Sequence, residues 1–287
     1  MAGVNHALIE IEDASFGYRA GDPVLRGVSA SLPAGCPTVM LGPNAAGKST
    51  LLRLMLGQLK PDAGRVRIAG EDVRRLSIER RADLLAFVPQ RGELATAFEV
   101  REVVELGRQA QPRSHAAVEH AMNLCGLLQL ADRQHRDLSA GQQQRVLLAR
   151  ALAQLMDPLT LRARPGTALI LDEPASAMDP RHAYETAALL RRWCLDSPGS
   201  AVLAVVHDLN LAAALAPRVW LLEAGRLVAQ GEWSEAAPPA RLSELLGLPV
   251  RLITSHVAPV PDAQPRSFYA VGPASPVAGT SHEVISP

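Results

Sequence analysis

The sequence predicts an α/β fold built on a parallel β-sheet. Two apolar runs, "ALILDEP" and "AVLAVVHD", end in acidic residues. Buried parallel strands have this pattern, with functional groups collected at their carboxyl ends. Elsewhere the apolar residues recur every three or four positions, which is the period of a helix. Strands that alternate with helices in this way imply helices packed against a parallel sheet.

The first third of the chain is expected to be rich in strands. Residues 7–41 form short alternating segments, and "GYRAGDP" between them predicts a turn. "TVML" predicts a buried strand that leads into a glycine-containing loop, and "KSTLLRLMLGQL" then predicts a helix. Gly57 and Pro61 bracket the expected end of this helix. "GRVRIAG" predicts another strand followed by a turn.

The rest of the chain is expected to be helical before strands return. The helical period runs from about Phe98 to Leu130. Ser139 with Gln142 three residues later has the capping-box pattern, which predicts a helix over "AGQQQRVLLARALAQLM". "VWLLEAGRLVAQGE" predicts a hairpin. From about Val250 the chain is rich in Pro, Ser and Ala without a period, so we expect a loosely ordered extension.

Composition restricts the class of protein. Hydrophobic residues make up 48% and charged residues 20%, which is typical of a globular chain. The net charge is zero, which argues against a general binder of nucleic acid or anionic lipid. The three cysteines have neither metal nor disulfide spacing, so a reducing compartment is expected. No apolar run reaches about 18 residues, so any membrane role would need partner subunits.

A phosphate-binding motif follows the "TVML" strand. Gly42, Gly47, Lys48 and Ser49 match the pattern G-x-x-x-x-G-K-S. Backbone N–H groups and the helix N-terminus would face an anion, Lys48 would reach the outer phosphates, and Ser49 would offer its hydroxyl to Mg²⁺. The alternative is a glycine turn that happens to precede a helix. The candidate nucleotide-binding residues are Gly42, Pro43, Asn44, Ala45, Ala46, Gly47, Lys48, Ser49 and Thr50.

Two adjacent acids form the second candidate element. Asp172 lies at the end of the apolar strand in "ALILDEP" and is the expected metal carboxylate. Glu173 follows it and is placed to polarise an attacking water. An ordinary acidic strand end is the alternative, and a preceding phosphate loop in the same chain favours the catalytic interpretation.

The stretch "LSAGQQQR" resembles the signature sequence of ATP-binding cassette (ABC) ATPases. This resemblance implies that Ser139, Ala140, Gly141 and Gln142 face the γ-phosphate held by a second protomer, so that two cassettes enclose two ATP molecules. The helix that these residues open would add its N-terminal dipole to the anion site.

Four further motifs agree with the resemblance, and they follow in the family's order. Gln90 in "FVPQ" matches the Q-loop residue that contacts Mg²⁺ and water. Asp179 in "SAMD" matches the D-loop, and His207 in "VVHD" matches the switch histidine that contacts the γ-phosphate. Tyr18 in "FGY" matches the aromatic residue that stacks on adenine. Each motif is weak alone, but the ordered set is specific.

The resemblance implies a P-loop NTPase (RecA-like) core with an N-terminal antiparallel β subdomain and an inserted α-helical subdomain at about 91–150. The cassette would span 1–250, and 251–287 would be the extension. The implied activity is Mg²⁺-dependent ATP hydrolysis by a homodimer at the cytoplasmic face of the bacterial inner membrane. Two integral-membrane permease subunits and, indirectly, a periplasmic substrate-binding protein are the implied partners; nucleic acid is not.

Several functional classes share this cassette. DNA-repair cassettes carry coiled-coil or zinc-bearing insertions. Translation-factor cassettes usually occur as a pair in one chain. Neither feature is found in this sequence. "VREVVELGRQ" and "VVHDLNLAA" resemble importers of iron chelates, haem and cobalamin. The extra stretch "MDPLTLRARPGTA" and the closing "LGLPVRLI" resemble haem importers, although a neutral surface insertion is the alternative. Siderophore and cobalamin import stay open, because such a cassette never touches the cargo.

Two alanines depart from the commoner glycine of the family. Ala45 and Ala140 both keep their backbone N–H donors. If either position needs a positive φ, the Cβ atom costs on the order of 1 kcal/mol. We therefore expect an active ATPase whose site is tuned rather than abolished.

Overall fold

The computed structural model describes residues 7–19, 21–90, 98–255 and 266–271. The chain forms two compact units, residues 1–237 and 238–287. Each unit is described by itself.

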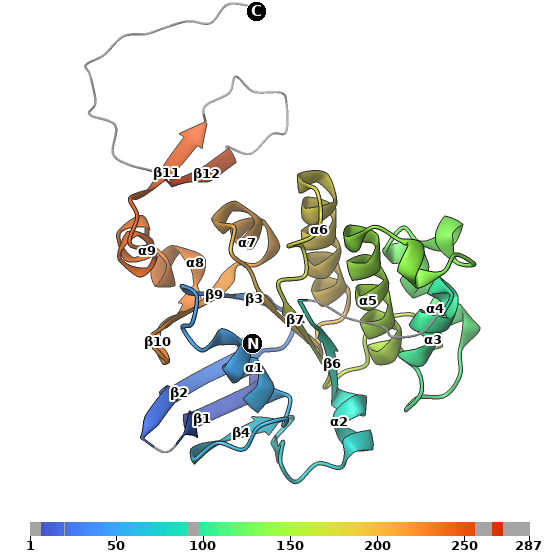
Figure 1. Cartoon of the computed structure of the whole chain (residues 1–287), viewed down its shortest axis with the longest axis horizontal. Helices are drawn as coiled ribbons and strands as arrows, with labels where there is room; N and C mark the ends of the chain where they lie inside the picture. The colour runs from blue at the N-terminus through green and yellow to red at the C-terminus, as the bar shows by residue number, and fades with distance from the viewer. Residues whose placement is uncertain (1–6, 20, 91–97, 256–265, 272–287) are drawn as a thin grey trace, which may run out of the picture. The chain divides into compact units, whose positions relative to one another are not determined.

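A six-stranded sheet forms the centre of the first unit (Figure 1). Its neighbouring strands are parallel except for the final hairpin, in which β9 and β10 are antiparallel. This arrangement confirms the predicted α/β fold and the predicted terminal hairpin. In spatial order the strands are β10 (Arg226–Glu232), β9 (Arg218–Glu223), β3 (Pro37–Leu41), β8 (Ala201–Val205), β7 (Ala168–Asp172) and β6 (Leu85–Val88).

A second sheet is antiparallel and comes from the first part of the chain, which confirms the expected N-terminal β subdomain. Ile9 lies opposite Ile68, and Ile11 lies opposite Val66, so apolar side chains share one face. In spatial order the strands are β2 (Asp22–Pro33), β1 (Ala7–Arg19), β4 (Ala63–Ile68) and β5 (Glu71–Asp72).

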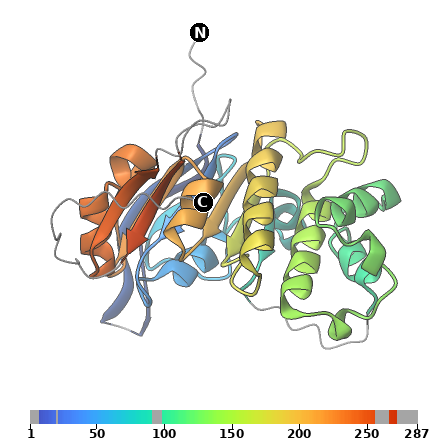
Figure 2. The same ribbon diagram turned by 90° about the horizontal axis from the view of Figure 1, so that it is seen from above.

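Helices surround the central sheet, and α3, α4 and α5 are grouped at one end of this unit in Figures 1 and 2. This group is the described part of the expected helical subdomain; residues 91–97 lie outside the described residues. No helix in the described ranges is long and apolar enough to cross a membrane. The helices of this unit are α1 (Lys48–Met55), α2 (Ile78–Leu84), α3 (Val100–Leu106), α4 (His115–Leu124), α5 (Ala140–Leu155), α6 (Pro180–Asp196), α7 (Leu209–Leu215) and α8 (Trp233–Ala236), with 3₁₀ turns at Leu128–Leu130 and His135–Asp137.

The core of this unit holds the site's scaffold in place. Every residue of β3 and β8 is buried. Met40, Leu51, Leu52 and Trp220 are among the large side chains that are almost fully inaccessible to solvent. Each such side chain contributes about 1.5–3 kcal/mol through burial. The loop after β3 therefore extends from a rigid strand.

The extra stretch between α5 and β7 is a closed loop. Met156 and Ala163 form an antiparallel bridge across its base. Asp157 Oδ1 accepts the N–H groups of Leu159 and Thr160 at 2.9 and 2.8 Å, which fixes the turn. The side chain of Leu159 is exposed. The insertion thus has a defined backbone of its own.

The second unit contains α9 (Pro239–Leu246) and a hairpin of β11 (Val250–Ser255) and β12 (Arg266–Val271). Leu252 lies opposite Tyr269, and Ile253 lies opposite Phe268. At its own residues the hairpin differs from the expected loosely ordered extension, because "VRLITS" and "RSFYAV" carry the β-branched and aromatic residues that favour strands. The other residues of the expected extension, 256–265 and 272–287, lie outside the described residues.

Candidate active site

The loop between β3 and α1 follows the backbone geometry that a phosphate cradle needs. Gly47 caps α1 with a φ of 100°. A Cβ atom on Gly42 would lie 2.1 Å from the carbonyl oxygen of Leu222, so only glycine fits there. Ala45 also adopts a positive φ, of 63°. The loop thus turns its backbone toward the first turn of α1.

Lys48 is buried at the start of α1. Its Nζ donates to the carbonyl oxygens of Gly42 and Pro43 at 2.7 and 2.8 Å. Burial lowers the pKa of Lys48, while the charges of Glu173 and Asp172 act in the opposite direction. Two of its three N–H donors serve these contacts with described residues, so the ammonium is held across the loop with one donor left for an anion.

Ser49 and Asp172 bring the loop and β7 together. The hydroxyl of Ser49 donates to Asp172 Oδ2 at 3.2 Å. Burial raises the pKa of Asp172, which the hydrogen bond from Ser49 opposes. A hydroxyl and a carboxylate in contact offer oxygen ligands of the kind that Mg²⁺ prefers.

Glu173 occupies the turn directly after β7. Its φ of 51° is unusual for a residue with a side chain. The turn is held because Glu173 N donates to the Val205 carbonyl at 3.1 Å and Ser176 Oγ donates to the Glu173 carbonyl at 3.1 Å. Positive φ values at non-glycine residues are costly and often mark functional sites.

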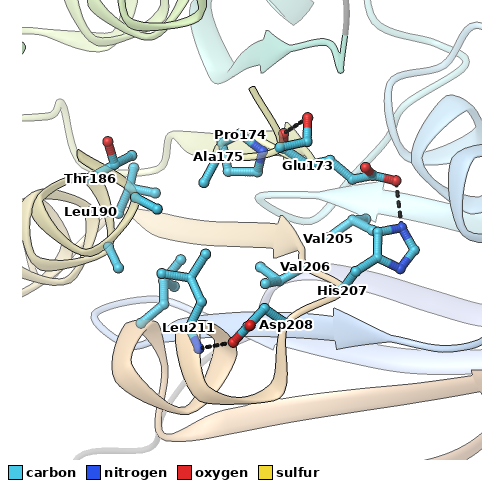
Figure 3. A pocket seen from close by; sticks show the side chains of 14 residues that line it. Glu173, Pro174, Ala175, Thr186, Leu190, Val205, Val206, His207, Asp208 and Leu211 are labelled. Carbon is cyan, nitrogen blue, oxygen red and sulfur yellow. Dashed lines mark hydrogen bonds and ion pairs between the residues drawn. The ribbon is translucent and has the colours of Figure 1, made fainter. Parts of the chain in front are cut away.

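Both carboxylate oxygens of Glu173 have partners. His207 Nε2 lies 2.5 Å from Oε1, and Gln90 Nε2 donates to Oε2 at 2.7 Å. Figure 3 shows the His207 ring pointing at the Glu173 carboxylate. The three residues follow β6, β7 and β8, which are neighbours in the sheet. Their carboxyl ends therefore meet at one edge, and the structure brings the three predicted residues together.

A mostly apolar hollow lies beside Glu173 and His207, between α6 and α7 (Figure 3). Its polar members are few. The sequence did not reveal it, because its lining is spread over α6, α7, β8 and the segments that follow β7 and β8. The lining residues are Glu173, Pro174, Ala175, Ser176, Ala183, Thr186, Ala187, Leu190, Val205, Val206, His207, Asp208, Leu211 and Leu215. An apolar wall of this kind strengthens electrostatic interactions of the adjacent carboxylate.

Tyr18 lies at the end of β1 and is anchored to α1. Its hydroxyl is 3.4 Å from Thr50 Oγ1 and accepts a hydrogen bond from Arg53 Nη1 at 3.0 Å. The contact with Thr50, followed by that with Arg53, lowers the pKa of Tyr18. Its ring packs edge-on against Phe16, with the ring centroids 5.0 Å apart. Tyr18 is 55% exposed, so the anchored ring stays accessible to a planar ligand.

The signature residues open α5, as the sequence predicted. Ser139 Oγ accepts from Gln142 N at 3.3 Å, and Gln142 Oε1 accepts from Ser139 N at 3.0 Å, which is the expected capping box. Ala140 is the first helical residue and does not have a positive φ. The cost of a Cβ atom at positive φ therefore applies to Ala45 and not to Ala140.

Asp179 lies next to the signature. It caps α6 by accepting from His182 N at 3.0 Å, and its other carboxylate oxygen lies 2.6 Å from His182 Nδ1. A Cβ atom on Gly141 would lie 3.0 Å from the Ala177 carbonyl, so the two segments are in close contact. One hollow is lined by Ser139, Ala140, Gly141, Gln142, Arg145, Ala177, Met178, Asp179 and His182.

The predicted site residues thus fall into two groups within one chain. The loop 42–50, Gln90, the acids after β7 and His207 form one group. The signature and Asp179 form the other, and none of the residues 42–50 lines their hollow. Sequence reasoning missed His182 and Arg53. The spacing D-x-x-H at the start of a helix was the available signal for His182.

Comparison with known proteins decides the family. Residues 25–176 match the family model described as ABC transporter, which covers more than half of the chain. The chain belongs to the ABC transporter ATP-binding family. This ABC ATPase hydrolyses ATP in support of transport, and the fold expected from the resemblance is confirmed.

Individual relatives match this ABC ATPase over most of its length. It is 40% identical over 242 residues to a hemin import ATP-binding protein, HmuV, of Pseudomonas putida, covering 83% of this chain and 92% of the relative. It is 34% identical over 252 residues to HmuV of Rhizobium meliloti, covering 86% of this chain and 95% of the relative. A solved structure of a metal-chelate type ABC transporter in an inward-facing conformation aligns with a TM-score of 0.73 and 26% identity, covering 93% of this chain and 97% of that one.

Proposed function

We propose that this ABC ATPase energises the import of haem across the bacterial inner membrane. The observation that carries the proposal is the likeness to HmuV proteins over nearly their whole length. The likeness to a metal-chelate type transporter supports the same class of cargo. The closed loop at 156–163 is part of the sequence resemblance to haem importers.

The residues around Asp172 fit a magnesium ion bound together with ATP. Ser49 and Asp172 supply two oxygen atoms that lie 3.2 Å apart. Gln90 gives its Nε2 to Glu173, which leaves its amide oxygen for the metal. No group of three His, Cys, Asp or Glu side chains suited to a metal occurs in the described ranges. The phosphates of ATP would therefore complete the coordination. The ion would neutralise charge on those phosphates.

Glu173 has the geometry of the general base. Its two carboxylate oxygens are held by His207 and Gln90, so the side chain is oriented before a substrate arrives. In the proposed reaction Glu173 accepts the proton of the water that attacks the γ-phosphate, while the bond from the γ-phosphorus to the bridging oxygen breaks and ADP leaves. The His207 side chain is 44% exposed and is placed to turn from Glu173 to the γ-phosphate. Lys48 and the loop amides hold the phosphates, and Tyr18 stacks on adenine.

The active site is completed by a second copy of the chain in this proposal. Ser139–Gln142 and Asp179 line a hollow that is separate from the residues 42–50. The N-terminus of α5, where the helix dipole favours negative charge, suits the γ-phosphate held by the partner protomer. Two copies would then enclose two ATP molecules.

The proposed transporter contains two integral-membrane permease subunits above this dimer, at the cytoplasmic face of the inner membrane. A hollow along α3 is a suitable place for them, because it lies in the helical subdomain that follows Gln90. Its lining combines apolar and charged side chains: Phe98, Glu102, Glu105, Leu106, Arg108, Gln109, Gln111, Arg113, Ser114, His115 and Val118. A periplasmic substrate-binding protein would act through the permease. We assign 1–250 to the cassette, with the helical subdomain at about 91–150, and 251–287 to an extension.

The central test is ATP turnover by the assembled complex and by its Glu173→Gln variant. The amide keeps the shape of the carboxylate but cannot accept the proton. We expect turnover to fall by at least about a hundredfold, while ATP binding persists. Equal rates would remove Glu173 from its assigned role.

Cargo needs a separate measurement. The reconstituted complex should hydrolyse ATP faster when haem-loaded binding protein is added than when the empty protein is added. Stimulation by a ferric-siderophore or cobalamin-loaded binding protein instead would assign the importer to that cargo, with the same cassette chemistry.

A further inference from the structure

Asp179 and His182 form a pair that serves two purposes at the start of α6. Asp179 Oδ1 accepts the backbone N–H of residue 182 at 3.0 Å, which caps the helix. Asp179 Oδ2 lies 2.6 Å from the imidazole Nδ1 of His182. Only the second contact depends on the side chain at position 182. A substitution of His182 therefore frees one carboxylate oxygen and leaves the cap in place.

The pair lies beside the signature residues. His182 and Asp179 line the same hollow as Ser139 and Gln142. The Ala177 carbonyl lies so close to Gly141 that a Cβ atom there would be 3.0 Å from it. The segment 177–179 thus packs against the first turn of α5 with little space to spare. A displacement of this segment would therefore press on the first turn of α5, which carries the signature amides.

The next turn of α6 holds the same segment. Thr186 Oγ1 donates to Met178 Sδ at 3.4 Å. Asp179 is therefore fixed through His182 on one side, and Met178 is fixed through Thr186 on the other. Loss of the imidazole would leave the Asp179 carboxylate with a single anchor, at the helix cap.

We propose that His182 is a positioning residue for ATP hydrolysis: it holds Asp179, and with it the segment 177–179, against the signature helix of its own protomer. This inference rests on the proposed composite site. His182 touches neither Lys48 nor Glu173 in the described contacts. It acts on the half of the site that its protomer offers to the partner's nucleotide.

The simplest test compares His182→Ala with His182→Asn. The Asn amide can donate to Asp179 Oδ2, whereas Ala cannot. We expect the kcat of His182→Ala to fall about fivefold, the KM for ATP to stay within twofold, and Asn to restore at least half of kcat. Arg181→Ala is the matched control, because Arg181 lies on the same turn and pairs with Glu185 at 2.9 Å. Wild-type kcat in His182→Ala would overturn the inference, as would equal losses in Ala and Asn.

Mixed dimers separate this inference from the proposed site. One protomer carries Lys48→Ala, which disables its loop, and the other carries Ser139→Arg, which disables its signature. Their mixture should have one working site, formed by the loop of the second protomer and the signature of the first. If this mixture is inactive while each chain folds, the composite site fails, and the inference about His182 fails with it.

If the mixture is active, the effect of His182→Ala in each of the two protomers tests the inference about His182. Placed in the Lys48→Ala protomer, it should lower turnover about fivefold, because that protomer supplies the working signature. Placed in the Ser139→Arg protomer, it should have no effect. Equal losses in both placements would indicate a general structural role and overturn the proposal.

Discussion

At the scale of single residues, the two alanines that replace glycine are in different situations. Ala45 has a φ of 63°, so its Cβ atom is strained in the loop. Ala140 begins α5 in ordinary helical conformation, where alanine is favourable. The sequence raised the same question at both positions. The sequence could not show at which position the Cβ atom is strained, because φ is set by the loop or helix around each residue.

The replacement of each alanine by glycine should therefore have opposite effects on stability. Ala45→Gly removes strain and should raise the free energy of unfolding by up to about 1 kcal/mol. Ala140→Gly removes a helix former and should lower it by about 0.5–1 kcal/mol. Urea denaturation of both variants beside the parent chain measures the difference. Changes of the same sign would show that the two positions are alike.

The residues of the proposed catalytic group were predicted from motifs, but the distances between them were not. Gln90 and His207 were identified from short patterns, and Glu173 from an apolar strand followed by acids. The contacts of Glu173 with both depend on the strand order β8-β7-β6. Periodicity within one strand carries no information about which strands are neighbours, so the distances could not be derived from it.

At the scale of elements, strand positions were predicted better than helix ends and peripheral segments. The helix α1 ends at Met55 rather than near Leu59, because Gly57 turns the chain with a φ of 66°. The hairpin of β11 and β12 was missed because its flanks are rich in Pro and Ser. Core strands have a strong apolar signal, and short exposed strands do not.

The helical subdomain contains a buried titratable group. His135 is 3% exposed, and its Nε2 has no hydrogen-bond partner among the described residues. Burial lowers the pKa of His135, which contact with Gln143 partly opposes. The unfolded chain therefore takes up a proton at a higher pH than the folded chain does. Stability from this residue is present above the unfolded pKa, near 6.5, and is lost as the pH falls below it.

We expect the free energy of unfolding to decrease between pH 7 and pH 5, and His135→Asn to reduce the size of that decrease. His115→Asn is the control, because the His115 side chain is 68% exposed and this variant keeps His135. Urea denaturation at a series of pH values gives the change in the free energy of unfolding with pH for each variant. A slope unchanged in His135→Asn would exclude His135 as a source of acid sensitivity.

At the scale of the whole molecule, the proposed function gives one chain two half-sites. The order of motifs in the sequence was enough to expect this, and the hollow at the signature agrees with it. The sequence offered no information on how the segments 177–179 and 139–142 pack, because that contact joins the segment before α6 to the start of α5, which lie far apart in the chain. The D-x-x-H spacing could have pointed to the contact of His182 with Asp179, but not to its place beside the signature.

Variants in the two halves should therefore fail in different ways. Lys48→Ala removes the charge that holds the phosphates, so we expect the loss of ATP binding and turnover together. Ser139→Arg disturbs only the half offered to the partner, so ATP binding should persist while turnover is lost. Calorimetric titration with ATP and a phosphate-release assay distinguish these results. Normal turnover by Ser139→Arg would contradict the trans arrangement.

The mass of the Glu173→Gln chain with and without Mg·ATP tests the composite site most directly. This variant should bind ATP without hydrolysing it, and light scattering after size exclusion should detect a nucleotide-dependent dimer that holds two ATP molecules. Addition of Ser139→Arg to the same chain should leave ATP bound and prevent the dimer. A Glu173→Gln chain that binds ATP and stays monomeric, or a dimer that Ser139→Arg does not disturb, would contradict the account.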